Sequence, residues 1–516
     1  MVVVVLGSLY VLALCLAKSF PDDNSVYACV TMLACIGMVC YLRNIVAINV
    51  GIMLPIAVVL AFVIQAITGF RQLYHGNGNA SFIQGGLANS GAFANYLSAI
   101  VPLMLAATIA RDGIKRKIRK LAGVLTIAAF VLVLFTQARA AFMGIMTGTA
   151  CVVFFLSKKK KYRQWLTIFV MGIIIIPLLL FAIYLLKPES AAGRITIYRV
   201  SANIIQDHPF TGVGPNRFGA VYNNYQAAYF KNGQQSLSKQ LLASNILEAY
   251  NVVLQVLTEY GFIGLFLLAG LVYELIKSCI VYQRHHPSNW LYAGSAGCLV
   301  SVMVAGFFSN PFHVTPVLLL VTWHLAVIVQ PVKHTIVAPA KNYYLSAIVL
   351  LVCIMLGYRV IQKHRAERQW QKAAELARLN DFENARHLYS AVYPVLAYNG
   401  DFLFNYGAEA CVAGDYATAI EQLEKAKRYS SLSNIRVFLA DAYAATNQYQ
   451  LAEVNYLAAV YTTPSHIYPK YKLVRLYKKW GKPALASEWT KRTLQYPVKI
   501  PSELSESLIQ SLKEGN

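Results

Sequence analysis

The chain has 516 residues, of which 57% are hydrophobic and 13% charged, and its mean hydropathy is +0.48. A soluble protein of this size cannot bury so much apolar surface, so the composition excludes that class and predicts a polytopic membrane protein. The net charge of +23 falls largely in short clusters beside apolar segments, which is typical of membrane anchors. We do not expect nucleic-acid binding, because binding the phosphates of a nucleic acid requires a continuous basic face.

Apolar stretches of membrane-spanning length recur along the first 358 residues. The first stretch lacks the basic start and the cleavage site of a signal peptide, so we interpret it as a span. The sequence therefore predicts a transmembrane helix bundle of about eleven spans. They lie near residues 2–17, 26–42, 45–68, 92–110, 121–137, 140–157, 165–186, 250–276, 290–307, 312–330 and 342–358.

Basic clusters orient these spans, because cytoplasmic loops retain Lys and Arg. The clusters lie at residues 111–120, 158–163, 277–284 and 333–341. If all are cytoplasmic, the N-terminus is cytoplasmic and the segments 69–91 and 187–249 face outward. The part after residue 358 then also lies outside. Arg359, Lys363 and Arg365 argue against that side, but long domains cross membranes largely regardless of charge.

Arg139 lies between two apolar runs, at the outer membrane surface in this orientation. The positive-inside bias disfavours a cation there, and an ionisable residue near membrane depth usually marks a functional site. The alternative is an arginine that pairs with a carbonyl of a neighbouring helix. We favour the functional interpretation.

The segment 187–249 is expected to be a large polar loop that carries Arg194, Arg199, His208 and Arg217. Arginine is suited to binding phosphate, because its planar guanidinium group donates two parallel hydrogen bonds and stays charged. Glycines at 212 and 214 would let a substrate approach the backbone, or would simply form a tight turn. The histidine would titrate near neutrality or cap a turn. Tyrosines and amides nearby suit carbohydrate, and equally a membrane-interface belt.

A polar stripe follows on the next apolar helix, where Asn251, Gln255 and Glu259 recur every four residues. Such a stripe faces a cavity or a neighbouring helix. Asn251 is the better site candidate, whereas hydrogen bonding between helices explains the other two equally well. Acidic residues are few in the outward segments, and no CxxC or HExxH spacing occurs, so we expect no metal and no cofactor.

From about residue 365 the chain becomes amphipathic and repetitive. Ala385, Ala419, Ala452 and Ala486 are 34, 33 and 34 residues apart, and an aromatic residue precedes each of the first three by three positions. This spacing resembles tetratricopeptide repeats, whose paired helices stack because none can bury its apolar face alone. We therefore expect a membrane domain over 1–358 and a soluble α-solenoid over 359–516. Its concave surface would recruit a protein partner.

The motifs of the membrane part resemble the O-antigen ligase superfamily, which also includes O-antigen polymerases and protein O-oligosaccharyltransferases. The resemblance covers about residues 70–330 and rests on segments 85–103, 136–144, 193–214 and 251–264. Ala138 stands where the family has serine, and Tyr198 where many relatives have tryptophan. Family membership implies an all-α, GT-C-like bundle in the bacterial inner membrane.

The resemblance also implies a metal-independent, inverting glycosyltransferase that works on the periplasmic face. It would move a glycan from undecaprenyl diphosphate to lipid A-core or to a protein hydroxyl, among the lipids of the inner membrane. By match, Arg139 and Arg194 hold the diphosphate, whose growing negative charge guanidinium groups stabilise. Arg199, His208, Arg217, Asn251 and Gln255 complete the expected binding site.

Tyr250 stands where ligases and oligosaccharyltransferases commonly have histidine. A phenol, with a pKa of about 10, is a poor base near neutrality. Either Tyr250 orients the acceptor, or Glu248 or His208 is the base, or the chain is a polymerase that joins lipid-linked repeat units. A non-enzymatic scaffold that recruits partners through its repeats is a further alternative. A transporter would need paired inverted halves, and none is evident.

Overall fold

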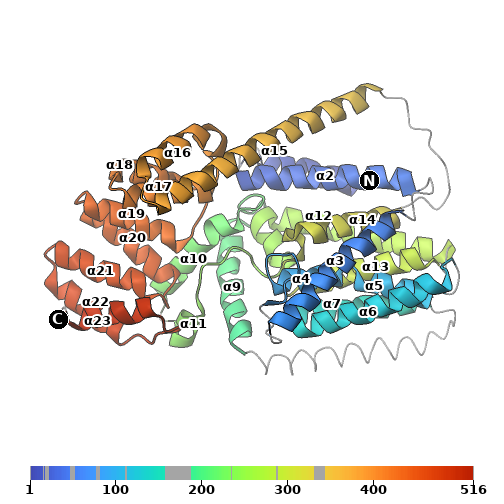
Figure 1. The fold of residues 1–516 in the computed structure, drawn as a ribbon, viewed down its shortest axis with the longest axis horizontal. Coiled ribbons are helices and arrows are strands. Elements are labelled where there is room, and N and C mark those ends of the chain that lie inside the picture. The colour runs from blue at the N-terminus through green and yellow to red at the C-terminus, as the bar shows by residue number, and fades with distance from the viewer. Residues whose placement is uncertain are drawn as a thin grey trace.

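The computed structural model describes residues 2–15, 17, 23–46, 53–76, 82–110, 113–156, 188–233, 235–285, 289–329 and 343–514. Over these ranges the regular structure is helical, with no strand among them, so the predicted all-helical class is confirmed (Figure 1). The expected span at 165–186 and the basic cluster at 158–163 lie outside the described residues.

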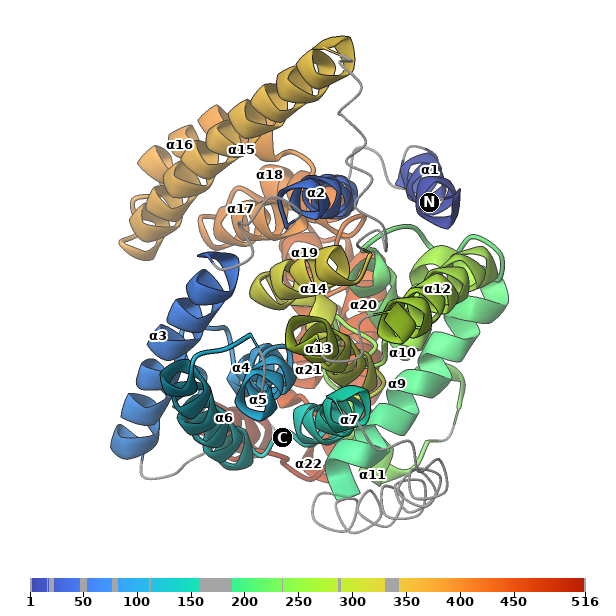
Figure 2. The same cartoon turned by 90° about the vertical axis from the view of Figure 1, so that its right-hand side faces the viewer.

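Apolar helices of the first part lie alongside one another, as the end-on view in Figure 2 shows. Their bounds are α1 Val2–Leu14, α2 Asp23–Val46, α3 Met53–His75, α4 Ser90–Ser98, α5 Val101–Ile109, α6 Arg116–Thr136, α7 Arg139–Leu156, α12 Val252–His285, α13 Trp290–Gly306, the short 3₁₀ helix η4 Pro311–His313 and α14 Thr315–Ile328.

Five segments of the described chain are long and apolar enough to cross a membrane, namely Ala57–His75, Ser90–Ile109, Arg116–Thr136, Arg139–Leu156 and Val252–Val281. Shorter apolar helices cover Ser25–Val39, Trp290–Gly306 and Thr315–Ile328. A helical membrane bundle fits these segments, while the number of spans stays a prediction.

The span expected at 92–110 is divided into α4 and α5 by a break at Ala99 and Ile100. Pro102 lies in the first turn of α5, where its missing N–H would have no helical partner. The ring nitrogen Nε2 of His324 lies 2.9 Å from the Ala99 carbonyl oxygen, so this carbonyl has a hydrogen-bond partner at the break. No sequence pattern had indicated this role of the histidine.

Close packing of α7 against α13 fixes the start of α7. A Cβ atom at Gly144 would collide with the Ser301 carbonyl group, and one at Gly148 with the Gly297 carbonyl oxygen. Small residues let two membrane helices approach to backbone contact. The position of Arg139, the first residue of α7, is therefore set by a rigid helix pair.

The segment expected to be a large polar loop is instead mostly helical. Its helices are α9 Pro188–Asp207, α10 Phe218–Asn232 and α11 Leu237–Leu242. The buried rings of Phe218 and Tyr222 stack with centroids 5.0 Å apart and pack with Val200 and Ile204 of α9. Their fourfold spacing is helical, but the surrounding amides and tyrosines obscured it. In Figure 1 these helices lie between the bundle and the C-terminal helices.

The C-terminal part is a stack of helices that contact one another in chain order. Their bounds are α15 Tyr343–Arg378, α16 Phe382–Leu396, α17 Gly400–Val412, α18 Tyr416–Ala426, α19 Ser433–Ala445, α20 Tyr449–Thr462, α21 Ile467–Lys479, α22 Pro483–Leu494 and α23 Glu503–Glu514. The domain boundary expected at 358 falls inside α15, whose later residues Ala366, Ala373 and Ala377 belong to the core of this stack.

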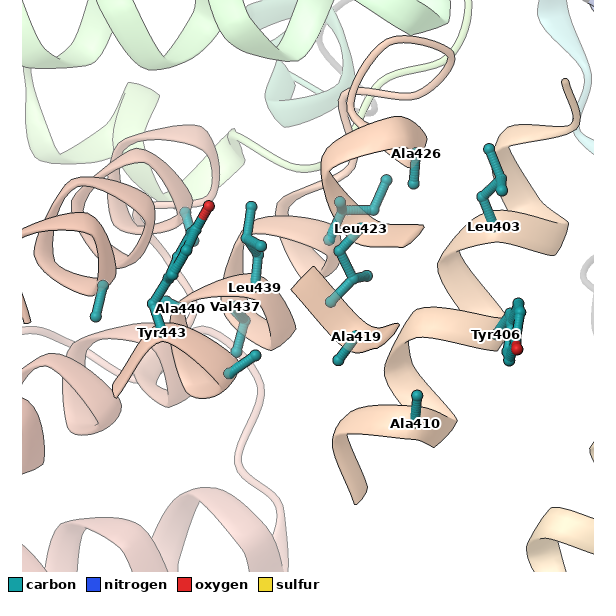
Figure 3. Close-up of a cluster of buried hydrophobic side chains, with 14 of the residues drawn as sticks. Leu403, Tyr406, Ala410, Ala419, Leu423, Ala426, Val437, Leu439, Ala440 and Tyr443 are labelled. Atoms are coloured by element: carbon teal, nitrogen blue, oxygen red, sulfur yellow. The ribbon is translucent and has the colours of Figure 1, made fainter. Parts of the chain in front are cut away.

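All four periodic alanines are buried, with at most 3% of each exposed, where a larger side chain would push neighbouring helices apart. Figure 3 shows Leu403, Tyr406 and Ala410 along α17 and Ala419, Leu423 and Ala426 along α18, all of which belong to this core. Paired, stacked helices agree with the predicted form, and the tetratricopeptide assignment stays a prediction.

We expect Leu423→Ala to destabilise the C-terminal stack by about 2–5 kcal/mol, because it leaves a cavity at a fully buried position. Thermal unfolding of the detergent-solubilised full-length protein measures the effect. Leu451→Ala is the matched control, because Leu451 is 46% exposed. Equal melting temperatures for the two variants would contradict this packing.

Candidate functional site

The loop after α9 is joined to a break in α12 by four backbone hydrogen bonds. Gly261 breaks the helix with φ 64° and ψ −165°. The freed N–H groups of Phe262 and Ile263 donate to the carbonyls of Pro209 and Phe210, at 2.8 and 3.3 Å. In return, the carbonyls of Thr258 and Glu259 accept from Val213 and Gly214, at 2.8 and 3.0 Å. We call this exchange between residues 209–214 and 258–263 the backbone clasp.

Glycine is required on both sides of the backbone clasp. A Cβ atom at Gly212, whose φ is 62°, would collide with the Glu259 backbone, and one at Gly261 with the Phe210 backbone. The close approach that these glycines permit is thus between two backbone segments of the protein, the turn after α9 and the break in α12. Tyr10 of α1 supports the clasp, because its hydroxyl donates to the Tyr260 carbonyl at 2.7 Å.

Arg139, Arg194 and Tyr250 come together at one end of the bundle, from α7, α9 and the segment before α12. The charge of Arg194 acts on the Arg139 guanidinium group, so the two side chains lie within electrostatic range of each other. The Arg194 Cζ atom lies 5.9 Å from the centroid of the Tyr250 ring, within cation–π range. The structure thus assembles the three predicted catalytic residues, and their catalytic roles stay predictions.

Tyr250 is held in an uncommon backbone conformation, with φ 51°. A bulky residue in the left-handed region costs of order 1–3 kcal/mol, and such strain clusters at functional sites. Burial and the charge of Glu248 raise the pKa of the Tyr250 hydroxyl, and Arg194 opposes them only in part. The phenol therefore stays protonated near neutrality and can donate a hydrogen bond, but it cannot act as a base.

Glu248 pairs with His313, a residue that we did not single out in the sequence. Its Oε1 atom lies 3.1 Å from Nδ1 of His313, and the two side chains are 32% and 34% exposed. Partial burial tends to lower the pKa of His313, but the hydrogen bond and charge of Glu248, helped by Glu259, raise it above the ordinary 6.5. In the sequence this histidine lies at the start of the span expected at 312–330, and the structure places it in the short helix η4.

Asn251 and Gln255 are used mainly to build the fold. The Asn251 side chain accepts from the Leu254 N–H at 3.1 Å and donates to the Phe307 carbonyl at 3.0 Å. Buried Gln255 accepts from the Ala249 N–H at 2.8 Å and donates to Glu259 at 2.7 Å. This network shapes the segment that holds Tyr250, and the substrate-binding roles expected of Asn251 and Gln255 stay predictions.

The remaining candidates are Arg199, His208 and Arg217. Arg199 is exposed on α9 and lies about 140° around the helix from Arg194. His208 is exposed just after the end of α9. Arg217 reaches the C-terminal stack, where its Nη2 atom donates to the Arg428 carbonyl at 3.2 Å. Their binding roles stay predictions. Within the described ranges, no group of three or more His, Cys, Asp or Glu residues is placed to hold a metal ion.

A model of the O-antigen ligase family matches residues 124–269. The match runs from α6 into α12, so it contains Arg139, Arg194, Tyr250 and both sides of the backbone clasp. A comparison with curated proteins finds no significant match. Together with the apolar helices, the family match supports the O-antigen ligase superfamily and indicates an integral membrane protein. It also suggests a glycosyltransferase-like enzyme.

We expect Gly261→Ala to lower the melting temperature of the full-length protein and to reduce any activity of the site. The change places a Cβ atom against the Phe210 backbone and forces alanine into a conformation that only glycine adopts readily, at a cost above about 1 kcal/mol. Gly37→Ala is the control, because the space around Gly37 is open. Unchanged stability of Gly261→Ala would show that the clasp is dispensable.

Proposed function

We propose that this protein transfers a glycan from a polyprenyl diphosphate, the undecaprenyl form in bacteria, to an acceptor hydroxyl at the outer face of the inner membrane. The observation that carries the proposal is the convergence of Arg139 and Arg194 from separate helices, inside the segment that matches the O-antigen ligase family. Two neighbouring guanidinium groups repel each other, and a diphosphate placed between them removes that repulsion.

The start of α7 strengthens this anion site. Arg139 is the first residue of the helix, so the positive end of the α7 dipole lies beside the guanidinium groups. During transfer, the acceptor oxygen attacks the anomeric carbon opposite the diphosphate, and the bond from that carbon to the phosphate oxygen breaks with inversion. The negative charge that grows on the diphosphate is stabilised by this preorganised positive end.

The ends of α6 support an outward-facing site. Arg116, Lys117, Arg119 and Lys120 lie in the first turns of α6, and Thr136, at its other end, directly precedes the turn to Arg139. The positive-inside rule places the basic end in the cytoplasm and the arginine pair outside. A lipid-linked donor that has been moved to the outer leaflet would meet the site there. The C-terminal stack contacts α10 at this same end, so it would also be periplasmic.

Attachment to lipid A-core, attachment to protein and polymerisation of repeat units differ in the acceptor and share one donor site. Deletion of the gene, followed by glycan-stained gels of lipopolysaccharide and periplasmic proteins, separates them. Loss of the ladder of glycan bands from lipopolysaccharide would identify a ligase. Shortening of the glycans to single repeat units would identify a polymerase. Loss of a glycoprotein signal would identify an oligosaccharyltransferase.

We expect Arg139→Ala and Arg194→Ala each to reduce transfer by about 100-fold or more in the complemented deletion strain, because each removes charge stabilisation of the leaving diphosphate. Immunoblots of the membrane fraction check that both variants insert normally. Arg199→Ala, on another side of α9, is the matched control and should retain most transfer. Full transfer by both test variants would remove the arginines from the mechanism and leave the scaffold hypothesis.

A further inference from the structure

A cleft of about 260 Å³ lies where the end of the bundle meets the C-terminal stack. Glu248 and His313 line it from the bundle side. Asn399 and Asp401, at the start of α17, and Ser430, after α18, line it from the other side. The cleft is smaller than the roughly 300–1,000 Å³ of drug-sized ligand pockets, so it fits a group of about one sugar ring.

Hydrogen bonds across the domain contact hold the two walls in place. The Ser431 hydroxyl donates to the Gly219 carbonyl at 2.7 Å and accepts from the Asn223 side chain at 3.1 Å. The Ser433 N–H donates to Asn245 at 3.0 Å, and Gln226 donates to the Thr462 carbonyl at 2.6 Å. Much of this network is buried, so the C-terminal stack is a fixed part of the cleft.

The Glu248–His313 pair has the arrangement of an oriented base. An ionised carboxylate only accepts hydrogen bonds, so the proton of the neutral imidazole lies on Nδ1, which faces Glu248. The Nε2 atom then carries the lone pair that can accept a proton. Tyr250 lies near both the pair and Arg194, because the charges of Glu248 and Arg194 act on its hydroxyl and the Arg194 Cζ atom lies 5.9 Å from the centroid of its ring.

We propose that this cleft is the acceptor subsite, which receives a sugar residue of the acceptor, and that His313 accepts the proton of the attacking hydroxyl. The inference rests on the proposed function and adds the base that Tyr250 cannot supply. Amide, carboxylate and hydroxyl groups line the cleft, and such groups pair with the hydroxyls of a sugar. The C-terminal stack therefore forms one wall of the acceptor site.

The acceptor oxygen forms a bond to the anomeric carbon of the donor sugar, and its proton passes to Nε2 of His313. The bond between that carbon and the phosphate oxygen breaks, and the diphosphate leaves with the electron pair beside Arg139 and Arg194. The resulting imidazolium is stabilised by Glu248 and then releases its proton to solvent.

The first test measures transfer kinetics in nanodiscs, with the polyprenyl-diphosphate-linked glycan extracted from the deletion strain as donor and the unglycosylated acceptor fraction of that strain as acceptor. His313→Gln should lower kcat by about 10²–10⁴-fold, because it removes the base but keeps a polar side chain. His387→Gln, an exposed histidine on α16, is the matched control.

The pH profile separates a base from a structural residue. Transfer by the wild type should fall as the pH drops through a value above 6.5, because protonated His313 cannot accept the proton. Glu248 and Glu259 face this histidine, and Asp401 lines the cleft opposite it. The acidic limb should be absent from the residual activity of His313→Gln. An unchanged kcat of His313→Gln, or an acidic limb that persists in this variant, would overturn the role of His313.

Asp401→Asn tests the wall of the cleft that the C-terminal stack forms, and it changes no residue of the bundle. It should raise KM for the acceptor about tenfold or more and leave kcat nearly unchanged, because it weakens a charge-assisted hydrogen bond to the sugar. An unchanged acceptor KM would overturn the assignment of the cleft, and this test remains decisive if His313→Gln fails to fold.

Binding of undecaprenyl diphosphate to the same nanodiscs distinguishes the two proposals. His313→Gln and Asp401→Asn should bind it as tightly as the wild type, whereas Arg194→Ala should not. Wild-type protein that neither binds it nor transfers glycan would refute the proposed function. Normal wild-type transfer together with unaffected cleft variants would refute only the acceptor subsite.

Discussion

The backbone clasp is the constraint on which the arrangement of the site depends. An unbroken helix would satisfy the carbonyls of Thr258 and Glu259 internally, through the N–H groups of Phe262 and Ile263. At Gly261 those bonds are exchanged for bonds to residues 209–214, so each of these four backbone groups keeps a partner at the break. The exchange anchors the end of α9 to α12, while α7 is anchored to α13, and these contacts bring Arg194 and Arg139 within electrostatic range of each other.

Features that rest on periodicity or on the cost of charge in a membrane could be predicted from the sequence. The all-helical class follows from long apolar runs, and the burial of Ala385, Ala419, Ala452 and Ala486 follows from their spacing. Arg139 was conspicuous because a cation between apolar runs is costly. Arg194 and Tyr250 were found through the family motifs, and the structure places all three together.

Features that depend on contacts between distant segments could not be predicted. His313 is an ordinary residue until folding brings it to Glu248, 65 positions away. Gly212 suggested room for a substrate, but its neighbour is the backbone of α12. Asn251 and Gln255 looked like ligands because polar groups on an apolar helix need partners, and the structure supplies those partners from the protein backbone. The helices α9–α11 were not predicted, because their many polar residues suggested a loop. The apolar residues of α9 and α10 are buried against one another in the folded protein.

These contacts join the two parts of the chain into one working unit, in which the bundle supplies the proposed donor site and the C-terminal stack one wall of the proposed acceptor cleft. Both proposals require the arginine pair to face the outside. Cysteine labelling in intact cells tests this most directly, with Lys231→Cys on α10 and Lys117→Cys on α6 in a protein without native cysteines. We predict that a membrane-impermeant maleimide labels position 231 in intact cells and position 117 only after permeabilisation. The reverse pattern would contradict the account.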